Sequence, residues 1–296
     1  MGESQSSLRL QFWQRSDHLD LAERAARRLS ATPRPFLRWV GSKQAILKSI
    51  VPMIPRRFRT YREPFMGSGA LFWLIEPDRA VLSDACNELT ETFQAIRENA
   101  EAVIRHLKPM KPNKKLFYQI RANRSRGRFK QAAEFIYLNK TCWNGLYRVN
   151  ANGDFNVPYG RPKTDFIADF GNLRACATAL QPKGIRLRSL DFEEALGDTK
   201  SGDFVYLDPP YVTKHNNNGF IDYNENLFSW DDQVRLARCA RHLARSGAKV
   251  IVSNANHKEV TDLYKGFEVV PVHRQSTLAS DAKKRGRVSE ALIVSI

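Results

Sequence analysis

Short apolar runs alternate with longer stretches of helical periodicity along most of this chain. Runs that predict buried strands occur at the start of 61–70 and at 79–83, 185–190, 203–207, 249–253, 267–272 and 291–296. Helical patterns occur at 19–29, at 46–51 before Pro52, from Ala70, at 87–107, around 165–180 and at 229–247. Strands that are apolar throughout and alternate with helices predict an α/β fold with a doubly wound, mostly parallel sheet.

The chain as a whole carries a strong positive charge. Its 47 Lys and Arg exceed its 31 Asp and Glu, which gives a formal net charge of +16. Such an excess attracts polyanions through phosphate contacts and counterion release, so nucleic acid is the leading candidate partner. A basic surface without such a partner is the alternative, and the charge indicates no reaction.

One segment concentrates this charge. Residues 108–130 contain nine Lys or Arg and no Asp or Glu, with Phe117 and Tyr118 among them. Solvated helical faces normally mix charge signs, so the stretch favours contact with phosphate, although a solvated face remains the alternative. We interpret 108–180 as a mainly helical insertion that follows DNA. The main domain then comprises 34–107 and 181–296, after an N-terminal extension at 1–33.

Cysteine spacing argues against a metal site and a disulfide framework, and hydropathy argues against a membrane span. The four cysteines are scattered and lack the spacing of metal ligands or of a disulfide framework. We therefore expect reduced thiols, no metal site and a cytoplasmic protein. No apolar run approaches the ~20 residues that span a bilayer, so we expect no membrane association.

The stretch 208–211, Asp-Pro-Pro-Tyr, has the clearest candidate chemistry. It follows the apolar run 203–207, and its prolines cannot continue a hydrogen-bonded ladder, so the strand ends there. Open α/β sheets bind ligands at the carboxyl ends of their strands. The Asp208 carboxylate and a freed backbone carbonyl can accept the hydrogens of an amino group on a planar base, while Tyr211 covers its face. A strand end with a packing tyrosine is the structural alternative.

Other turns have features of a nucleoside site. The glycine-rich turn at 63–70 lets the backbone approach a ligand, and it lacks the pattern of a dinucleotide or phosphate loop. Asp84 follows the run 79–83, where it can bond ribose hydroxyls or cap the next helix. Trp39 and Lys43 flank another glycine turn, where they can grip an adenine ring and a carboxylate or serve the core.

Three polar stretches complete the pattern. Residues 137–148 and 153–161 alternate aromatic, amide and basic side chains around glycines, which suits base edges as well as a tight structural hairpin. The loop 212–227 is rich in turn formers, and we expect a mobile flap or a surface loop. The basic stretch 283–287 can touch backbone phosphates.

Five segments in order resemble a known family. They are Phe36–Lys43, Glu63–Ala70, Ser83–Asp84, Phe135–Arg161 and Asp208–Tyr211. Over about residues 34–296 the chain is similar to the Dam-type, D12 class DNA adenine N6-methyltransferases. The resemblance implies a Rossmann-like methyltransferase sheet with an inserted DNA-recognition domain. It also implies S-adenosylmethionine as methyl donor and double-stranded DNA as partner, with adenine modified at GATC or a related short site.

The resemblance also implies a role for individual residues. The implied catalytic residues are Asp208, Pro209, Pro210 and Tyr211. The implied cofactor-binding residues are Trp39, Lys43, Glu63, Phe65, Gly67, Gly69, Asp84, Asp191, Phe192 and Asp208. The implied DNA-recognition residues are Lys140, Asn144, Leu146, Arg148, Pro158 and Arg161. No metal is implied, and we expect a monomer or a weak dimer.

The expected mechanism leaves three alternatives open. The target adenine leaves the duplex, Asp208 and the Pro209 carbonyl accept its N6 hydrogens, and the methyl group moves directly and in line. An N4-cytosine enzyme would usually carry Ser in place of Asp208. Enzymes that methylate protein glutamine or RNA usually carry Asn there. A DNA-binding protein without catalysis would need neither the carboxylate nor the glycine turn.

Overall fold

The structure is a computed structural model that describes Glu23 and residues 33–213, 228–275 and 287–295 of the 296-residue chain. The helix expected at 19–29, the flap expected at 212–227 and the basic stretch 283–287 lie wholly or largely outside the described residues.

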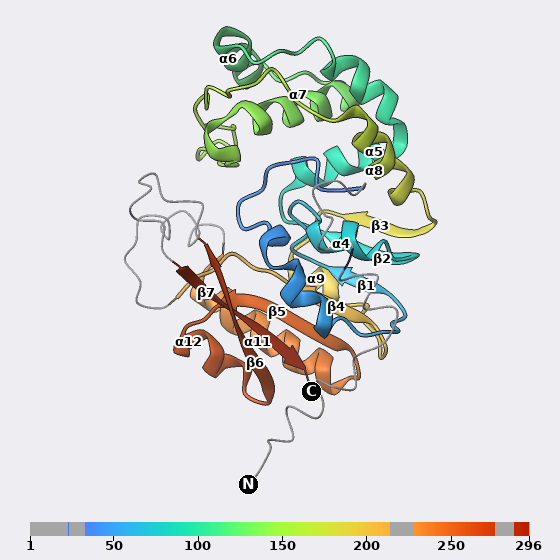
Figure 1. Ribbon diagram of the computed structural model, residues 1–296, viewed down its shortest axis with the longest axis vertical. Coiled ribbons are helices and arrows are strands. Elements are labelled where there is room, and N and C mark those ends of the chain that lie inside the picture. Colours follow the sequence, from blue (N-terminus) through green and yellow to red (C-terminus); the bar gives the residue numbers. More distant parts are fainter. Residues whose placement is uncertain (1–22, 24–32, 214–227, 276–286, 296) are drawn as a thin grey trace.

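A seven-stranded sheet forms the centre of the fold (Figure 1). Its strands are β1 (Tyr61–Glu63), β2 (Arg79–Ser83), β3 (Gly184–Arg188), β4 (Phe204–Leu207), β5 (Lys249–Ala255), β6 (Phe267–Gln275) and β7 (Arg287–Ser295). Their order across the sheet is β3-β2-β1-β4-β5-β7-β6. Strands β1 to β5 pair in parallel, whereas β7 runs antiparallel to both β5 and β6. The prediction of an α/β fold with a mostly parallel sheet is confirmed.

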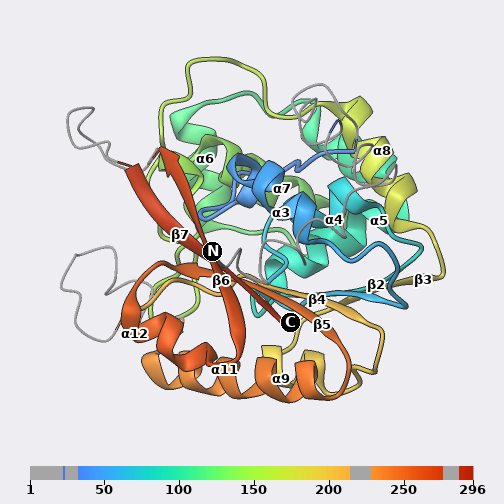
Figure 2. The same cartoon turned by 60° about the horizontal axis from the view of Figure 1, so that its bottom comes forward.

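Helices cover both faces of this sheet. The helices of the described ranges are α3 (Leu47–Ile50), α4 (Ala70–Ile75), α5 (Asn87–Leu107), α6 (Lys114–Ala122), α7 (Arg128–Thr141), α8 (Phe170–Leu180), α9 (Phe192–Leu196), α11 (Trp230–Arg245) and α12 (Lys258–Thr261). Short 3-10 turns are η1 (Lys43–Ala45), η2 (Val51–Met53), η3 (Trp143–Gly145) and η4 (Asp262–Tyr264). Figure 2 shows α9 and α11 on one side of the sheet and α3, α4, α5 and α8 on the other.

Strand β4 shows why the sheet needs two layers of helices. Successive side chains of a strand point to opposite faces. Phe204 and Tyr206 therefore join one hydrophobic core with α4, α5 and α7, whereas Val205 and Leu207 join a second core with α9 and α11. All four side chains are buried, so both faces must be covered.

The helices of segment 108–180 pack on the first of these cores. Helix α7 lies along α5 and is buried from Ala132 to Asn139, all around its circumference (Figure 1). Phe117 of α6 and Phe135 of α7 belong to the same hydrophobic cluster as Tyr61 of β1. The segment thus shares its core with the sheet.

Some element ends differ from those predicted, the start of the last strand among them. The last strand begins at Arg287 rather than Ala291, because it pairs through the buried polar residue Glu290. The α-helix α3 ends at Ile50, before Pro52 as predicted, and Pro52 lies in the 3-10 turn that follows. It stands near the start of η2, where its missing N–H costs no intrahelical hydrogen bond.

A buried ion-pair network lies at the amino end of β4. Asp203 is fully buried and accepts hydrogen bonds from Arg59 Nε at 3.0 Å and Arg62 Nε at 2.7 Å. The Lys200 amide donates to the same carboxylate at 3.1 Å. Burial alone would raise the pKa of Asp203, but these bonds outweigh it and hold the pKa below its ordinary value. The network ties β1 to β4 at the end opposite the candidate site.

Candidate functional site

Three carboxylates meet at the carboxyl edge of the sheet. Glu63 ends β1, Asp84 follows β2 and Asp208 follows β4, and these strands are parallel neighbours. From β1 the chain continues to β2 and β3 on one side, and it then crosses to β4 and β5 on the other. Open α/β sheets bind ligands at such a reversal. Three residues that the sequence singled out separately therefore lie in one place.

Asp208 is held by Lys43. The Lys43 ammonium lies 2.8 Å from Asp208 Oδ1 and donates a hydrogen bond to the Gly41 carbonyl at 2.7 Å. The side chains of Lys43 and Asp208 are only 6% and 16% exposed. The ammonium also lies over the Tyr211 ring, 4.8 Å from its centroid. Asp208 thus forms an ion pair with an ammonium group that rests against an aromatic face.

Tyr211 is fixed at its hydroxyl by Glu290, a residue that sequence reasoning missed. The hydroxyl donates a hydrogen bond to Glu290 Oε2 at 2.9 Å, and Glu290 is 1% exposed. Glu290 lies on β7 between Ala255 of β5 and Val272 of β6. Burial, and then the negative charges of Asp208 and Glu290, raise the pKa of Tyr211 well above its ordinary value. The hydroxyl therefore stays protonated and keeps this bond.

Glu63 is buried more deeply than the other two carboxylates. It is 2% exposed, and burial first, followed by the charges of Asp208 and Asp84, raises its pKa well above the ordinary value. No donor among the described residues reaches Glu63 Oε2. Buried polar atoms normally have a partner. A ligand that brings positive charge and hydrogen-bond donors would supply one here.

Asp84 and the glycine turn support each other. Asp84 accepts hydrogen bonds from the Gly67 amide at 2.9 Å and the Cys86 amide at 3.0 Å. Helix α5 has Cys86 as its N-cap, so Asp84 braces the turn ahead of the helix. Gly67 and Gly69 have φ of +48° and +68°, a region that favours glycine. A Cβ on Gly67 would lie 2.8 Å from Trp39 Cδ1, which shows how closely the turn packs on that ring.

An aromatic cluster lies beside this turn. Phe65 stacks on Phe192 with ring centroids 5.4 Å apart, and Phe228 packs edge-on against Phe65 at 5.7 Å. The Arg235 guanidinium lies 4.4 Å from the centroid of the Phe192 ring. Asp191 is the N-cap of α9 and forms an ion pair with Arg235 at 2.8 Å. The structure thus brings Phe65 and Phe192 together and places Asp191 at the exposed rim of the cluster.

The second group of candidate residues lies on a hairpin at 142–160. The Trp143 amide donates to the Pro158 carbonyl and the Asn156 amide to the Arg148 carbonyl, both at 2.9 Å. Arg148 Nε also donates to Asn156 Oδ1 at 2.6 Å. Asn144 has a left-handed backbone with φ of +53°. The exposed candidates are Asn144, Arg148, Pro158 and Arg161, whereas Lys140 and Leu146 are half-buried.

Two buried asparagines, also missed by sequence reasoning, tie segment 34–39 to the helices. Asn139 of α7 accepts a hydrogen bond from the Arg38 amide at 2.8 Å and donates to the Arg38 carbonyl at 2.6 Å. Asn172 of α8 does the same with Arg34, at 3.0 and 2.9 Å. A side-chain amide within an apolar helical segment could have predicted these contacts, because a buried amide needs hydrogen-bond partners. These two pairs of hydrogen bonds hold Trp39 between the helices and the glycine turn.

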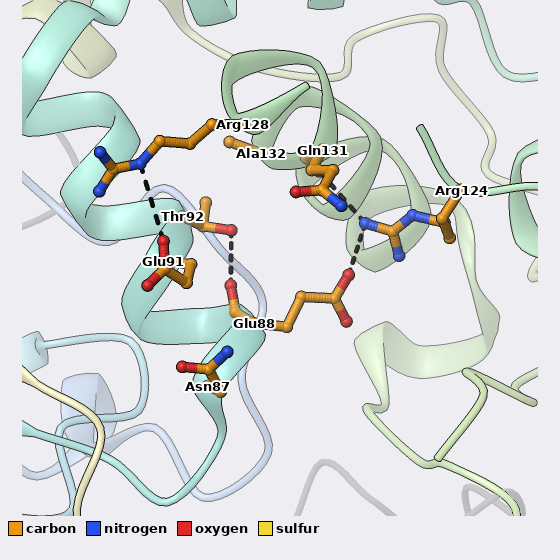
Figure 3. A pocket seen from close by; sticks show the side chains of 8 residues that line it. All are labelled: Asn87, Glu88, Glu91, Thr92, Arg124, Arg128, Gln131 and Ala132. Atoms are coloured by element: carbon orange, nitrogen blue, oxygen red, sulfur yellow. Dashed lines mark hydrogen bonds and ion pairs between the residues drawn. The ribbon is translucent and has the colours of Figure 1, made fainter. Parts of the chain in front are cut away.

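A pocket of about 230 Å³ lies between α5 and α7 (Figure 3). It is lined by Asn87, Glu88, Glu91, Thr92, Arg124, Arg128, Gln131 and Ala132. Arg124 pairs with Glu88 at 2.5 Å, and Arg128 pairs with Glu91 at 3.7 Å. Both arginines belong to the basic stretch 108–130. Each of the two therefore has a carboxylate partner within the protein, and phosphate contact by this stretch stays a prediction.

The structure also bears on metals, membranes and thiols. Across the described ranges, no three His, Cys, Asp or Glu side chains gather to hold a metal ion. None of the helices in those ranges is long and apolar enough to cross a bilayer. The four cysteines are free thiols, as the sequence predicts.

Comparisons with known proteins all find DNA methyltransferases. A family model described as D12 class N6 adenine-specific DNA methyltransferase matches residues 39–278. The chain is 34% identical over 268 residues to Type II methyltransferase M1.LlaDCHI of Lactococcus lactis subsp. cremoris, which covers 88% of this chain and 94% of the relative. It is 34% identical over 287 residues to Type II methyltransferase M.MjaIII of Methanocaldococcus jannaschii, covering 88% and 98%. It is 28% identical over 265 residues to the DNA adenine methylase of Escherichia coli strain K12, covering 88% and 94%.

Proposed function

Because the chain belongs to the family of D12 class N6 adenine-specific DNA methyltransferases, we propose that its methyl donor is S-adenosylmethionine and that Asp208 receives the amino group of the target adenine. The chain is an adenine-specific DNA methyltransferase. The observation that carries the proposal is the position of the Lys43 ammonium, which contacts both the Asp208 carboxylate and the Tyr211 ring. The Lys43 ammonium occupies the position that an exocyclic amino group on a stacked base would take.

The carboxyl edge of the sheet fits this cofactor. S-adenosylmethionine carries sulfonium and ammonium cations, ribose hydroxyls and an adenine ring, and it supplies an electrophilic methyl group. Glu63 offers a buried carboxylate oxygen without a donor among the described groups. The turn at Gly67 and Gly69, which follows Glu63 in the chain, has a left-handed backbone that lets it approach a ligand closely.

We assign the remaining cofactor residues by their positions. Asp84 lies at the end of β2, the usual position of a ribose-binding acid. The stacked rings of Phe65 and Phe192 offer a face for adenine, with Asp191 at its rim. Trp39 supports the glycine turn from outside. Lys43 pairs with Asp208 and keeps its carboxylate oriented until the base arrives.

The proposed transfer relies on positioning. Tyr211 stacks on the flipped adenine, and this stacking offsets part of the few kcal/mol that unstacking costs. Asp208 and the Pro209 carbonyl accept the two N6 hydrogens, which frees the nitrogen lone pair from the ring. The Pro210 ring, like that of Pro209, keeps this backbone out of the sheet. With the nitrogen aimed at the methyl carbon, geometry supplies much of the rate.

We propose that segment 108–180 is the DNA-recognition insertion in a catalytic domain of 34–107 and 181–296. Its hairpin presents Asn144 and Arg148, whose side chains suit adenine and guanine edges. Pro158 and Arg161 flank them on the exposed side, and Leu146 supports the hairpin from within. GATC, or a related short site, is the proposed target. The enzyme is proposed to act in the cytoplasm as a monomer or weak dimer; the free thiols support the compartment.

The direct test is transfer of labelled methyl from S-adenosylmethionine to an unmethylated plasmid, with nucleoside analysis and mapping of modified positions. We expect N6-methyladenine at one short motif. 4-Methylcytosine would contradict the assignment of Asp208 to adenine. DNA binding without any methylation would favour a binding protein that has lost catalysis.

The half-buried lysine beside the hairpin predicts a pH dependence of DNA binding. Burial, and then the charges of Arg38 and Arg34, lowers the pKa of Lys140 to about 8. The side chain is charged below that pH and neutral above it. If Lys140 donates to DNA, affinity for a site-containing duplex falls roughly tenfold between pH 7 and 9, the worth of one charge-assisted hydrogen bond.

Fluorescence anisotropy at fixed ionic strength measures this change. Lys140→Arg should flatten the profile, because arginine stays charged, whereas Lys130→Arg at an exposed site should leave it as in the wild type. A wild-type affinity that does not vary with pH would remove Lys140 from the DNA contact.

The Tyr211–Glu290 hydrogen bond predicts that Glu290 positions the stacking ring. Glu290→Leu leaves the Tyr211 hydroxyl without this acceptor, and we expect kcat to fall about 100-fold, the cost of a misplacement of order 1 Å. Glu290→Gln keeps an acceptor oxygen and should lose about tenfold or less. In the variant Tyr211→Phe, the further change Glu290→Gln should cost little, because the bond is already absent. Additive losses in that double variant would contradict the positioning role.

A further inference from the structure

The aromatic ring of Tyr147 joins the two halves of the proposed site. Tyr147 lies on the hairpin, between Asn144 and Arg148. Its ring stacks on Trp39 with centroids 5.7 Å apart and planes 23° from parallel. Trp39 in turn packs on the glycine turn so closely that a Cβ on Gly67 would lie 2.8 Å from it. The hairpin therefore reaches the cofactor turn through two rings in contact.

The hydroxyl of Tyr147 closes a second connection to the same turn. It is hydrogen-bonded to Cys86 and Glu88, at the start of α5. The Cys86 amide and the Gly67 amide both donate to Asp84. The contacts thus run in a ring from Gly67 to Asp84, Cys86, Tyr147 and Trp39, and back to Gly67.

The first turn of α5 is anchored to the helices of segment 108–180 as well. Glu88 pairs with Arg124 at 2.5 Å across the pocket between α5 and α7 (Figure 3). Burial, and then the charges of Cys86 and Glu88, raise the pKa of Tyr147 above its ordinary value, so its hydroxyl remains a donor at neutral pH. Closely packed contacts leave no free space for a side chain to shift alone, so a shift of the glycine turn must move either Trp39 or Tyr147.

We propose that Tyr147 couples the cofactor turn to the DNA-reading hairpin, so that cofactor occupancy and site recognition strengthen each other. The inference rests on the proposed function, since it takes the turn as the cofactor site and the hairpin as the DNA reader. Tyr147 is a positioning residue that touches neither reacting group. The proposal requires reciprocity: the factor by which cofactor tightens DNA binding equals the factor by which DNA tightens cofactor binding.

The test measures this factor with S-adenosylhomocysteine and an unmethylated duplex that carries the mapped site. We expect S-adenosylhomocysteine to tighten DNA binding by about tenfold in the wild type, within the usual range of coupling between sites. Tyr147→Leu should reduce the factor to about one, because it removes both the stack and the hydroxyl. Tyr147→Phe keeps the stack and should retain part of the coupling.

Tyr159→Leu is the matched control, because Tyr159 lies in the same hairpin but packs on Phe117 of α6. It should keep the wild-type factor, which separates coupling from general loosening of the hairpin. An unchanged factor in Tyr147→Leu, or no coupling in the wild type, overturns the inference. A methyl-transfer assay on the same preparation distinguishes the two proposals. Normal N6-methyladenine formation with no coupling rejects the role of Tyr147 alone, whereas absent methylation rejects the proposed function itself.

Discussion

Asp208→Ala should lower the rate of methyl transfer to DNA by at least about 1,000-fold. In the proposed mechanism the carboxylate accepts an N6 hydrogen and aims the nitrogen, and both effects vanish with it. Asp208 lies at the carboxyl end of β4 with its charge met by Lys43 at 2.8 Å. The loss should appear in kcat, measured with saturating S-adenosylmethionine and plasmid.

Asp208→Asn is the matched variant, because it keeps the size and one acceptor oxygen. It should fall between the wild type and Asp208→Ala. Circular dichroism and thermal unfolding should show that both variants are folded, since Lys43 keeps its hydrogen bond to the Gly41 carbonyl. If Asp208→Ala retained more than a tenth of the wild-type rate, Asp208 would not be the acceptor in the reaction.

Asp203→Ala, at the other end of the same strand, should lower the free energy of unfolding by about 3–5 kcal/mol, the cost of breaking a buried pair from one side. Asp203 is fully buried and Arg62 is 2% exposed, so the variant leaves a buried guanidinium without its partner at 2.7 Å. Asp198→Ala is the control. Asp198 also pairs with Arg62, but it is 43% exposed, and solvent-screened pairs contribute about 0–1 kcal/mol. Urea unfolding measures both, and equal midpoints for the two variants would contradict the prediction.

The same carboxylate predicts a sign for the dependence of stability on pH. The pKa of Asp203 is held below its ordinary value, so its contribution is fully present above that ordinary value, about 3.9. The contribution is lost as pH falls from there through the lower pKa of the folded state. Asp203→Ala should therefore show a shallower loss of stability than the wild type below pH 4.

The pair Asp203 and Asp208 shows how much of the site was readable from the sequence. Both flank one apolar run, yet only Asp208 is followed by two prolines and a tyrosine. This local chemistry marked the end of the strand and the candidate acceptor. The glycine turn at 63–70 and Asp84 were readable for the same reason, since each follows an apolar run directly. The deeply buried partner of Asp203 is Arg62 of β1, about 140 residues upstream, and no local sequence pattern predicts this pair.

The hydrophobic pattern by itself determined the fold class and the edge of the sheet where the site lies. A strand that is buried on both faces needs a continuous apolar run, and its backbone hydrogen bonding must stop at a proline. Both features can therefore be recognised from residues that are adjacent in the sequence. Only the tertiary structure decided which distant side chains complete the site. Glu290 reaches Tyr211, Tyr147 reaches Trp39, and Arg124 turns inward to Glu88. Each contact depends on strand register and on helix packing between segments that are far apart in the sequence. The hydrophobic periodicity of a single segment therefore cannot predict it.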